Sequence, residues 1–549
     1  RSKVKFNVWD VGVGGTFTLT DQFVDHNFPL RMKFQTDPGL EATISNPQVI
    51  NVRDGWVVTF TTPPTNADII VVYDGSSTET AQAAGRAFLR DGDIVSHRSM
   101  VKLDPGENLP EIYEIESPFK EDELEDLYFA QANDQMFLCQ SNHKPWRLTR
   151  YNPYDWRFEQ PEMKGAPWED AQYSPVDGFP EVVTFFQERL WFAATAAQPQ
   201  TVWGSEVANF YEFTLPASTD PYDPDDSVEY TVAAYTHEMV EWVSSERVLV
   251  FGTSQTEHRL SPDQYISADR LPKVSRMSAY GGAHIMPAYM GNMTVFVHSS
   301  RQQLRSYAQS SQSVIEKWDS IELDWAAEHL TRPGIKQIAY AMHPHSVLLM
   351  VTDDGDMLAM TYETSLGDAA SPGWTKSTTK GFMESLCVIP SDDDDQGWFA
   401  TEREVYTYDD QGETATTEKF TYVEFHDPTT FTDAALTYPP YDYVDNPSLY
   451  PPLQSLGNLD HLEGPEVTIR VNGNTHPPRT VLNGEIELNA EYQFIEVGLN
   501  FTPYVKLKRH EGGNPAGTDQ GQIGRWSEIW LRLVESAYPK VNGKRAPER

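Results

Sequence analysis

Short apolar runs, each preceded by a polar turn, recur along the middle of the chain. They cover residues 136–138, 190–192, 248–251, 293–297, 347–351 and 398–400. Their spacing of about 45–60 residues is close to the ~40–50 residues of a four-stranded propeller blade. A run that is apolar throughout is typical of a strand covered on both faces. The pattern predicts an all-β fold with a β-propeller of about six blades. Tandem β-sandwiches, whose strands are also closely spaced, are the alternative.

Turn-forming residues separate these runs from further strands. Residues 353–356 (DDGD) precede the apolar segment 357–360, and residues 198–200 (QPQ) precede 201–203. Glycine, aspartate and proline supply the backbone angles that tight turns require. The runs are therefore predicted to form hairpins within each blade, and residues 101–415 are assigned to the propeller.

The two ends of the chain differ from the middle. Residues 1–100 are predicted to form a separate β domain, with strands at 57–61 and 69–73 and a short helix at 79–89. Residues 466–549 are predicted to form a C-terminal β region that packs on the propeller or completes it. Its hairpin signal is Asn472-Gly473, a dipeptide suited to type I′ turns.

Between the propeller and the C-terminal region, residues 416–465 are predicted to form a linker or extended arm. Proline, tyrosine and aspartate are concentrated in residues 438–452, and such composition interrupts regular structure. A second helix is predicted at residues 321–330, capped by Asp319 or Ser320. No apolar run approaches the ~18 residues of a membrane span, and no signal peptide is expected.

The charge balance is strongly acidic. The 549 residues include 81 acidic and 42 basic residues, for a formal net charge of −39. Such a surface repels phosphate and gains no affinity from counterion release. The composition argues against a protein that grips nucleic acid, but not against one that nucleic acid slides past. Solubility alone is the simpler explanation of the charge.

Motifs of established catalytic chemistry are absent from the sequence. It contains no HExxH, CxxC, Walker-type or GxSxG motif, and the glycine-rich residues 12–15 do not lie between a strand and a helix. The carboxylate pairs used in glycoside hydrolysis cannot be selected among 81 acids. We therefore predict no catalytic, cofactor-binding or metal residue, no cofactor, and no enzymatic activity.

Several clusters admit two interpretations. Residues 392–395 resemble the Asp-box of sialidase propellers, but Gly397 abuts Trp398 and the motif is not repeated, which favours a solvated hairpin tip. The acidic turns 223–226 and 353–356 could hold calcium, although ordinary turn chemistry explains them. His343 and His345 are predicted to be exposed turn residues.

The two cysteines and two basic clusters also carry weak signals. Cys139 and Cys387 are too few for a disulfide framework, and both are predicted to be buried thiols. The basic clusters 506–509 and 544–545 are predicted to be solvated surface, with contact to a phosphate or a neighbouring subunit as the alternative.

Longer segments resemble one protein family. Residues 126–151 (DLYFAQANDQMFLCQSNHKPWRLTRY) and 178–213 (GFPEVVTFFQERLWFAATAAQPQTVWGSEVANFYEF) look like stretches of the tail nozzle proteins of podophages, short-tailed bacteriophages; the family is also called tail tubular protein B. Further similar segments are 275–281 (SRMSAYG), 327–334 (AEHLTRPG), 459–464 (LDHLEG) and 479–499. The family usually has a segment ahead of its propeller that residues 1–100 do not match; these residues instead resemble small β modules of phage fibres and tails.

The resemblance implies a structural protein of the virion. A homo-hexameric ring would lie below the portal and adaptor proteins, carry genomic DNA through its bore without sequence-specific binding, and support tail fibres or spikes. It would assemble in the cytoplasm of the host bacterium and come near the host envelope during infection. At six copies the formal charge would be on the order of −230.

Two other functions are compatible with a propeller of this composition. A glycan-binding or glycan-cleaving propeller, lectin-like or sialidase-like, would use the aromatic residues and acidic turns. An adhesin without ring symmetry is the third possibility.

Overall fold

The computed structural model describes strands within residues 16–95, most of residues 115–506, and residues 540–545. The gaps in the middle range are residues 116, 153–154, 171–172, 174, 217–222, 233–237, 246–247, 262–265, 270–272, 292, 310–317, 363–371, 392–393, 409–414 and 440–450. The glycine-rich residues 12–15, the basic residues 507–509 and most of the Pro- and Tyr-rich segment 438–452 lie outside the described residues.

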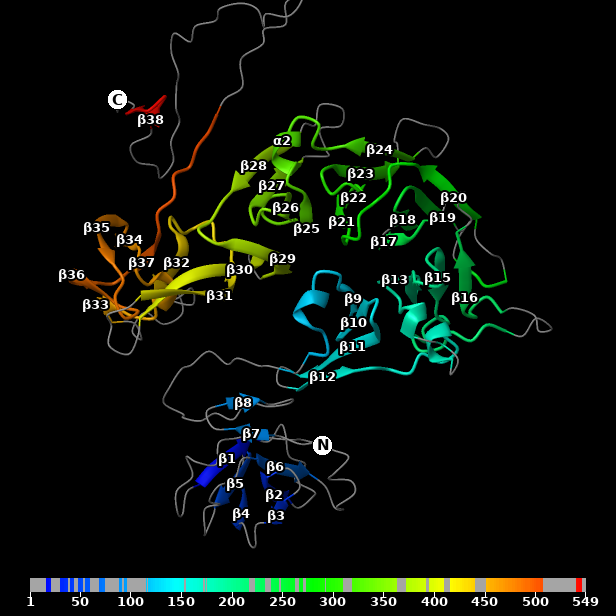
Figure 1. Ribbon diagram of the computed structural model, residues 1–549, viewed down its shortest axis with the longest axis horizontal. Helices are drawn as coiled ribbons and strands as arrows, with labels where there is room; N and C mark the ends of the chain where they lie inside the picture. Colours follow the sequence, from blue (N-terminus) through cyan, green and yellow to red (C-terminus); the bar gives the residue numbers. More distant parts are fainter. Residues whose placement is uncertain are drawn as a thin grey trace, which may run out of the picture.

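Six antiparallel sheets form a β-propeller, and five of them have four strands. Figure 1 shows the sheets arranged around a central axis, with the first strand of each sheet innermost. Blades 1 and 2 comprise β9 (Tyr128–Ala132), β10 (Gln135–Gln140), β11 (His143–Asn152) and β12 (Asp155–Glu159), then β13 (Val182–Phe186), β14 (Arg189–Ala193), β15 (Thr201–Gly204) and β16 (Val228–Thr231). The predicted all-β propeller of about six blades is confirmed.

The remaining blades follow in chain order. Blade 3 comprises β17 (Val240–Ser244), β18 (Leu249–Thr253), β19 (Glu257–Ser261) and β20 (Lys273–Ser278); blade 4 comprises β21 (Ala288–Met290), β22 (Met293–Val297), β23 (Leu304–Gln309) and β24 (Trp318–Glu322). Blade 5 comprises β25 (Ile335–Ala341), β26 (Val347–Thr352), β27 (Met357–Thr361) and β28 (Gly373–Ser377); blade 6 has only β29 (Phe382–Pro390), β30 (Asp395–Tyr408) and β31 (Ala415–Phe425).

The apolar runs of the sequence become the second strand of each blade, and their side chains fill the space between blades. Every residue of β14, β18 and β22 is buried. Between blades 3 and 4, the buried Trp242 ring lies 4.9 Å from that of Phe296. A side chain at Gly252 or Gly282 would overlap the Trp242 indole. These two glycines therefore allow the indole to lie directly against the backbone.

The C-terminal β unit follows blade 6. One sheet has the order β32 (Asp433–Tyr438), β37 (Ile495–Leu499), β34 (Glu466–Val471), β35 (Asn474–Thr480), and β33 (Leu453–Leu456) pairs with β36 (Ile486–Tyr492). Buried aliphatic residues from these strands form its own core. The hairpin at Asn472-Gly473 is confirmed, since both residues have positive φ between β34 and β35. A two-stranded hairpin, β38 (Lys540–Val541) and β39 (Lys544–Arg545), lies nearer the C-terminus.

The linker predicted at 416–465 is wrong over its described part, which contains most of β31, all of β32 and β33, and the 3₁₀ helix η8 (Asp460–Leu462). The helix predicted at 321–330 is also wrong. Residues up to Glu322 belong to β24, and only α2 (Glu328–Thr331) is helical. The buried Asp324 carboxylate accepts the Leu304 N–H at 3.2 Å and the Thr331 hydroxyl at 2.7 Å, so a turn separates strand from helix.

Near the N-terminus the described strands form three small sheets. Their orders are β1 (Thr16–Thr20), β5 (Gly55–Thr59), β4 (Gln48–Val52); then β3 (Leu40–Thr43), β2 (Leu30–Asp37), β6 (Ile69–Asp74); and β7 (Phe88–Arg90) with β8 (Asp93–Val95). The strands predicted at 57–61 and 69–73 correspond to the end of β5 and to β6, which belong to different sheets. The helix expected at 79–89 overlaps β7 at its end, and its other residues lie outside the described ones. No helix in the described part of the chain is long and apolar enough to span a membrane.

Candidate functional site

Charged side chains from all six blades gather at one end of the propeller axis, where the inner strands begin. We call this group the axial site, and its members are Glu125 and Asp126 before β9, Glu181 before β13, Glu241 in β17, His284 before β21, Lys336 in β25 and Glu384 in β29. Because every blade begins with its inner strand, these residues converge although they are scattered over some 260 positions of sequence.

One half of the axial site is acidic. The His284 ring lies between blades 1 and 3, with Nδ1 3.0 Å from the Glu241 backbone oxygen and 3.9 Å from its carboxylate, and Nε2 3.4 Å from the Asp126 backbone oxygen. Burial, together with the charges of Glu241 and Asp126, raises the pKa of Glu181 to about 7. Burial also raises the pKa of Glu241 to about 7. Two neighbouring carboxyls therefore titrate near neutral pH.

The buried Tyr128 and Cys139 side chains of blade 1 are uncharged. The Tyr128 hydroxyl donates to the Val243 backbone oxygen at 3.2 Å and accepts the Val243 N–H at 3.3 Å, which ties β9 to β17. Burial raises the pKa of Tyr128, and it raises the pKa of the buried Cys139 thiol well above its ordinary value. Both groups stay protonated at neutral pH, so neither is an activated nucleophile.

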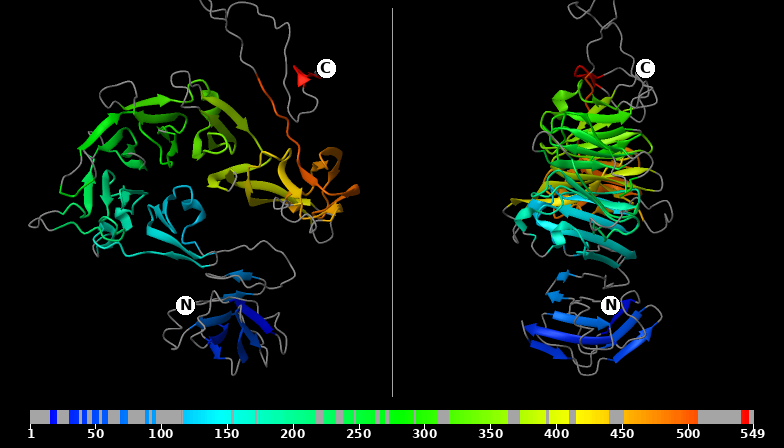
Figure 2. Two further views of the ribbon diagram at one scale, coloured as in Figure 1. Left: turned by 180° about the vertical axis from the view of Figure 1, so that it is seen from behind. Right: turned by 90° about the vertical axis from the view of Figure 1, so that its right-hand side faces the viewer.

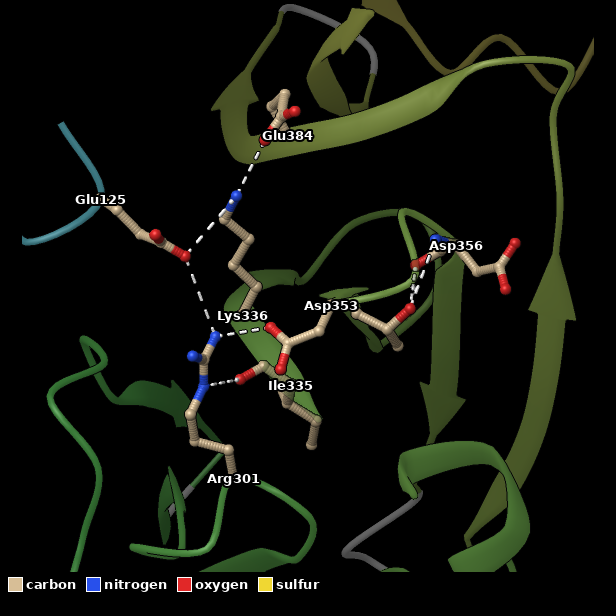
Figure 3. Close-up of polar contacts among 8 residues, drawn as sticks. Glu125, Arg301, Ile335, Lys336, Asp353, Asp356 and Glu384 are labelled. Carbon is tan, nitrogen blue, oxygen red and sulfur yellow. Dashed lines mark hydrogen bonds and ion pairs between the residues drawn. The ribbon is translucent and has the colours of Figure 1, made fainter. Parts of the chain in front are cut away.

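The other half of the axial site is an ion-pair network centred on Glu125 (Figure 3). The Glu125 carboxylate lies 3.6 Å from Lys336 Nζ and 4.0 Å from Arg301 Nη2. Lys336 also binds Glu384 at 2.8 Å, and Arg301 binds Asp353 at 2.7 Å. Arg301 Nε additionally donates to the Ile335 backbone oxygen at 3.2 Å. The network joins the start of blade 1 to blades 4, 5 and 6.

The carboxylates of this network neutralise the charges of Lys336 and Arg301. Burial lowers the pKa of Lys336, but the bond to Glu384 and the charge of Glu125 outweigh burial, so the pKa is raised overall. Lys336 and Arg301 each face at least one carboxylate, so they offer little attraction to an anionic ligand. Each described blade is a continuous stretch of chain, and among the described strands none is shared between the first and last blades. Glu125 contacts Lys336 of blade 5, which in turn contacts Glu384 of blade 6, so the network links the first blade to the last through Lys336.

The site was not predicted from the sequence. Glu181 and Glu241 carry no motif and are two of 81 acids. The signal that was available is positional: an ionisable residue stands at or beside the start of the innermost strand of every blade, the strand that precedes each apolar run. That signal becomes useful only once the blade order is known.

The acidic clusters singled out in the sequence do not include Glu181 or Glu241, although Asp353 belongs to the ion-pair network through Arg301. Asp395 is not at a solvated tip, because its carboxylate accepts the Met342 N–H at 2.7 Å and the His343 N–H at 3.0 Å; residues 392–393 lie outside the described ones. Asp226 accepts the Asp223 N–H at 2.8 Å within a turn. Asp356 pairs with Lys376 at 2.5 Å. Across the described residues, no group of His, Cys, Asp and Glu side chains could hold a metal ion.

Other singled-out residues are mostly at the surface. His343 and His345 are exposed, as predicted, and Lys506 and Lys544 are exposed. Cys139 is buried, but the prediction of burial is wrong for Cys387, which is exposed. The reason is strand alternation: in β29 the neighbouring Leu386 faces the core, so Cys387 faces outward.

No protein-family model and no curated protein matches the chain. Several solved propellers resemble its fold. The Pseudomonas aeruginosa periplasmic gluconolactonase and a Bacteroides uniformis protein described as a 6-phosphogluconolactonase are 12% and 9% identical; each match covers 55% of this chain and 88% of theirs, with a TM-score of 0.34. The propeller domain of Myceliophteria thermophila Cps50 (Swd1) is 8% identical over 60% of this chain and 86% of its own, with a TM-score of 0.31.

These neighbours correct one prediction. Two of them are described as lactonases, which contradicts the expectation, drawn from missing motifs, that the chain is not an enzyme. At these identities and TM-scores the likeness concerns the propeller architecture and assigns this chain no activity. The named neighbours are not phage tail proteins, so the resemblance to the nozzle family stays a prediction.

Proposed function

We propose that the chain is a subunit of the ring-shaped tail conduit of a short-tailed bacteriophage. The observation that carries the proposal is where the nozzle-like segments lie in the fold. Residues 126–151 make up most of blade 1, residues 178–213 contain three strands of blade 2, and residues 479–499 contain β36 and β37 of the C-terminal unit. A resemblance limited to a common blade motif would not extend to a separate sheet beyond the propeller.

The charge distribution supports a conduit that DNA passes without binding. The chain has a net charge of −39, and the cations of the axial site are paired with carboxylates. A ring of such subunits would present a negative wall, and like charge keeps DNA from adhering to it. Portal-proximal adaptors and fibres or spikes are the partners that this function requires.

Negative-stain electron microscopy of the purified protein and of phage particles that contain it tests the proposal. A six-fold ring with an open centre on the tail axis is expected. A gel-shift assay at low salt, where electrostatic binding is strongest, should show no retention of duplex DNA. Protein that stays monomeric at all concentrations, or that binds DNA tightly, would contradict the proposal.

The acidic carboxyl pair favours a second candidate, a glycan-cleaving propeller. Glycoside hydrolysis uses two carboxyl groups, one with a raised pKa that donates a proton. Glu181 and Glu241 both have a pKa of about 7 and flank one end of the propeller axis. Release of reducing ends from bacterial surface polysaccharides, lost in Glu181→Gln and retained in the exposed control Glu404→Gln, would establish this activity. Equal release by both variants would exclude the axial site.

A further inference from the structure

Blade 6 is one strand short. The other five blades have four strands, whereas blade 6 ends at β31. Among the described strands, β31 pairs only with β30, so its outer backbone edge has no strand beside it. It is eleven residues long, long enough to pair with a complete further strand. An open edge of this kind is a template for strand addition.

Three large apolar side chains of β31 are exposed beside its charged residues. Phe420, Val423 and Phe425 are 42%, 75% and 40% exposed. Natural edges are protected by charge, proline or bulges, whereas the register with β30 continues without a bulge from Trp398–Phe425 to Tyr408–Ala415. The edge is therefore regular, long and partly apolar.

The same chain carries an extended segment that lacks a partner strand. Residues 500–506 (NFTPYVK) follow β37, have no regular secondary structure, and are all exposed. Figures 1 and 2 show this segment leaving the C-terminal sheet and running away from it. Phe501, Tyr504 and Val505 are 50%, 80% and 82% exposed. We call residues 500–506 the C-terminal arm.

We propose that the C-terminal arm of one copy adds to β31 of a second copy as the missing fourth strand of its blade 6. The inference deepens the proposed ring, on which it rests, by naming the subunit contact. The open edge of β31 and the exposed C-terminal arm are separate surfaces of one chain, and the proposed contact brings them together between two copies. The contact is head-to-tail, because the arm and the edge are different surfaces, and such a contact forms a ring when the rotation between neighbouring subunits closes the circle.

The charges near the edge of β31 and at the end of the C-terminal arm are of opposite sign. The exposed Glu418 lies on β31 and the exposed Glu404 on the adjacent β30, whereas Glu402 is already paired with Lys419 of β31 at 2.5 Å. The arm ends in Lys506 and continues in sequence as Leu507-Lys508-Arg509, a basic cluster in a chain with net charge −39. Opposite charges steer association and fix its register.

Pro503 determines which side of the arm faces the partner. Proline has no N–H, so in an added strand it must stand where the N–H would point to solvent. Successive N–H groups of a strand alternate in direction. Thr502, Tyr504 and Lys506 therefore direct their N–H groups to β31, whereas Phe501 and Val505 direct theirs away.

This alternation supplies a matched pair of variants. Tyr504→Pro removes an N–H that bonds to β31, and Val505→Pro removes one that does not. Tyr504→Pro should raise the concentration for half-assembly roughly tenfold or more, while Val505→Pro assembles like the unmodified chain. Mass photometry over a concentration series measures the effect, and circular dichroism checks that both variants fold.

The outcomes separate the two proposals. If the unmodified chain forms rings and only Tyr504→Pro loses them, both proposals stand. Rings that survive Tyr504→Pro overturn the strand-addition contact and leave the conduit intact. A chain that forms no ring overturns both.

Disulfide trapping distinguishes a second copy from the chain's own arm. In a Cys387→Ser background, one variant carries Tyr504→Cys and another carries Thr421→Cys, with Lys419→Cys as the neighbouring register. Oxidation of the mixture should give a band of twice the monomer mass on a non-reducing gel. A third variant carries both Tyr504→Cys and Thr421→Cys in one chain. If cross-linking occurs only within this doubly substituted chain, and not in the mixture of single variants, the arm folds back on its own blade and the proposal is overturned.

Discussion

At the residue scale, the raised pKa values of Glu181 and Glu241 make stability depend on pH. Their pKa of about 7 in the folded protein exceeds the ordinary value of 4.5. The folded state therefore binds protons that the unfolded state has released between about pH 4.5 and 7. In that window their contribution to the free energy of unfolding falls as pH rises, and above pH 7 their ionised forms destabilise the fold.

Glu181→Gln removes this penalty. We expect the variant to be about 1–2 kcal/mol more stable than the unmodified chain at pH 8, after discounting for partial solvent screening, and about equally stable near pH 4.5. Urea unfolding at several pH values measures the difference, with the exposed Glu404→Gln as control. A stabilisation that is the same at pH 5 and pH 8 would contradict a titrating Glu181.

Substitution of Gly252 tests the packing between blades 3 and 4, because alanine adds one methyl group at this position. Its added side chain would overlap the buried Trp242 indole, which has no room to move away from Phe296. Gly252→Ala should lower the free energy of unfolding by about 1–3 kcal/mol. Gly457→Ala is the control, since its side chain would contact nothing within 4 Å. Thermal or urea unfolding of the two variants gives the comparison, and equal effects would argue against the close contact.

At the scale of elements, Arg403 joins blade 6 to the C-terminal unit. The guanidinium of this buried residue in β30 binds Glu424 at 2.6 Å and Thr379 at 2.9 Å and lies 3.7 Å from Asp433 of β32. Burial lowers the pKa of Arg403, but the Glu424 and Asp433 charges outweigh it and raise the pKa overall. The Arg403 guanidinium therefore supplies positive charge to two carboxylates, those of Glu424 and Asp433.

Arg403→Met should lower the free energy of unfolding by about 3–5 kcal/mol, because it leaves Glu424 and Asp433 without a counter-charge. The first region to loosen should be the junction between β31 and β32. Limited proteolysis followed by mass spectrometry would find new cuts near residues 426–432. Arg403→Lys keeps the charge and should lose less; an equal loss in both variants would assign the effect to the bidentate geometry rather than to charge.

Which elements were predictable follows from their side chains. The second strand of blades such as blade 5 is covered on both faces, so runs such as residues 347–351 are apolar throughout and stand out. β32 is half-buried along its whole length, without an apolar run or an alternation, so the sequence predicts a linker there. The axial site was missed because Glu181 and Glu241 meet only when separate blades converge, and no local spacing records that.

At the scale of the whole molecule, the closure of the propeller is the open mechanical question. A chain that begins and ends its propeller in separate sheets lacks a shared strand across the closing gap. Among the described residues, the Glu125 network reaches across that gap, because Glu125 contacts Lys336 of blade 5 and Lys336 contacts Glu384 of blade 6. Both Glu125 and Glu384 are partly exposed, so this bridge is sensitive to salt.

Glu125→Lys turns the bridge into repulsion, because it faces Lys336 and Arg301. We expect a loss of about 1 kcal/mol in the free energy of unfolding at low salt, and a smaller loss at 1 M salt, where exposed charges are screened within a few ångströms. The control Glu466→Lys changes the net charge equally on the exposed side of β34. If both variants lose stability equally at low salt, the effect is one of net charge, and the Glu125 network does not hold the first and last blades together.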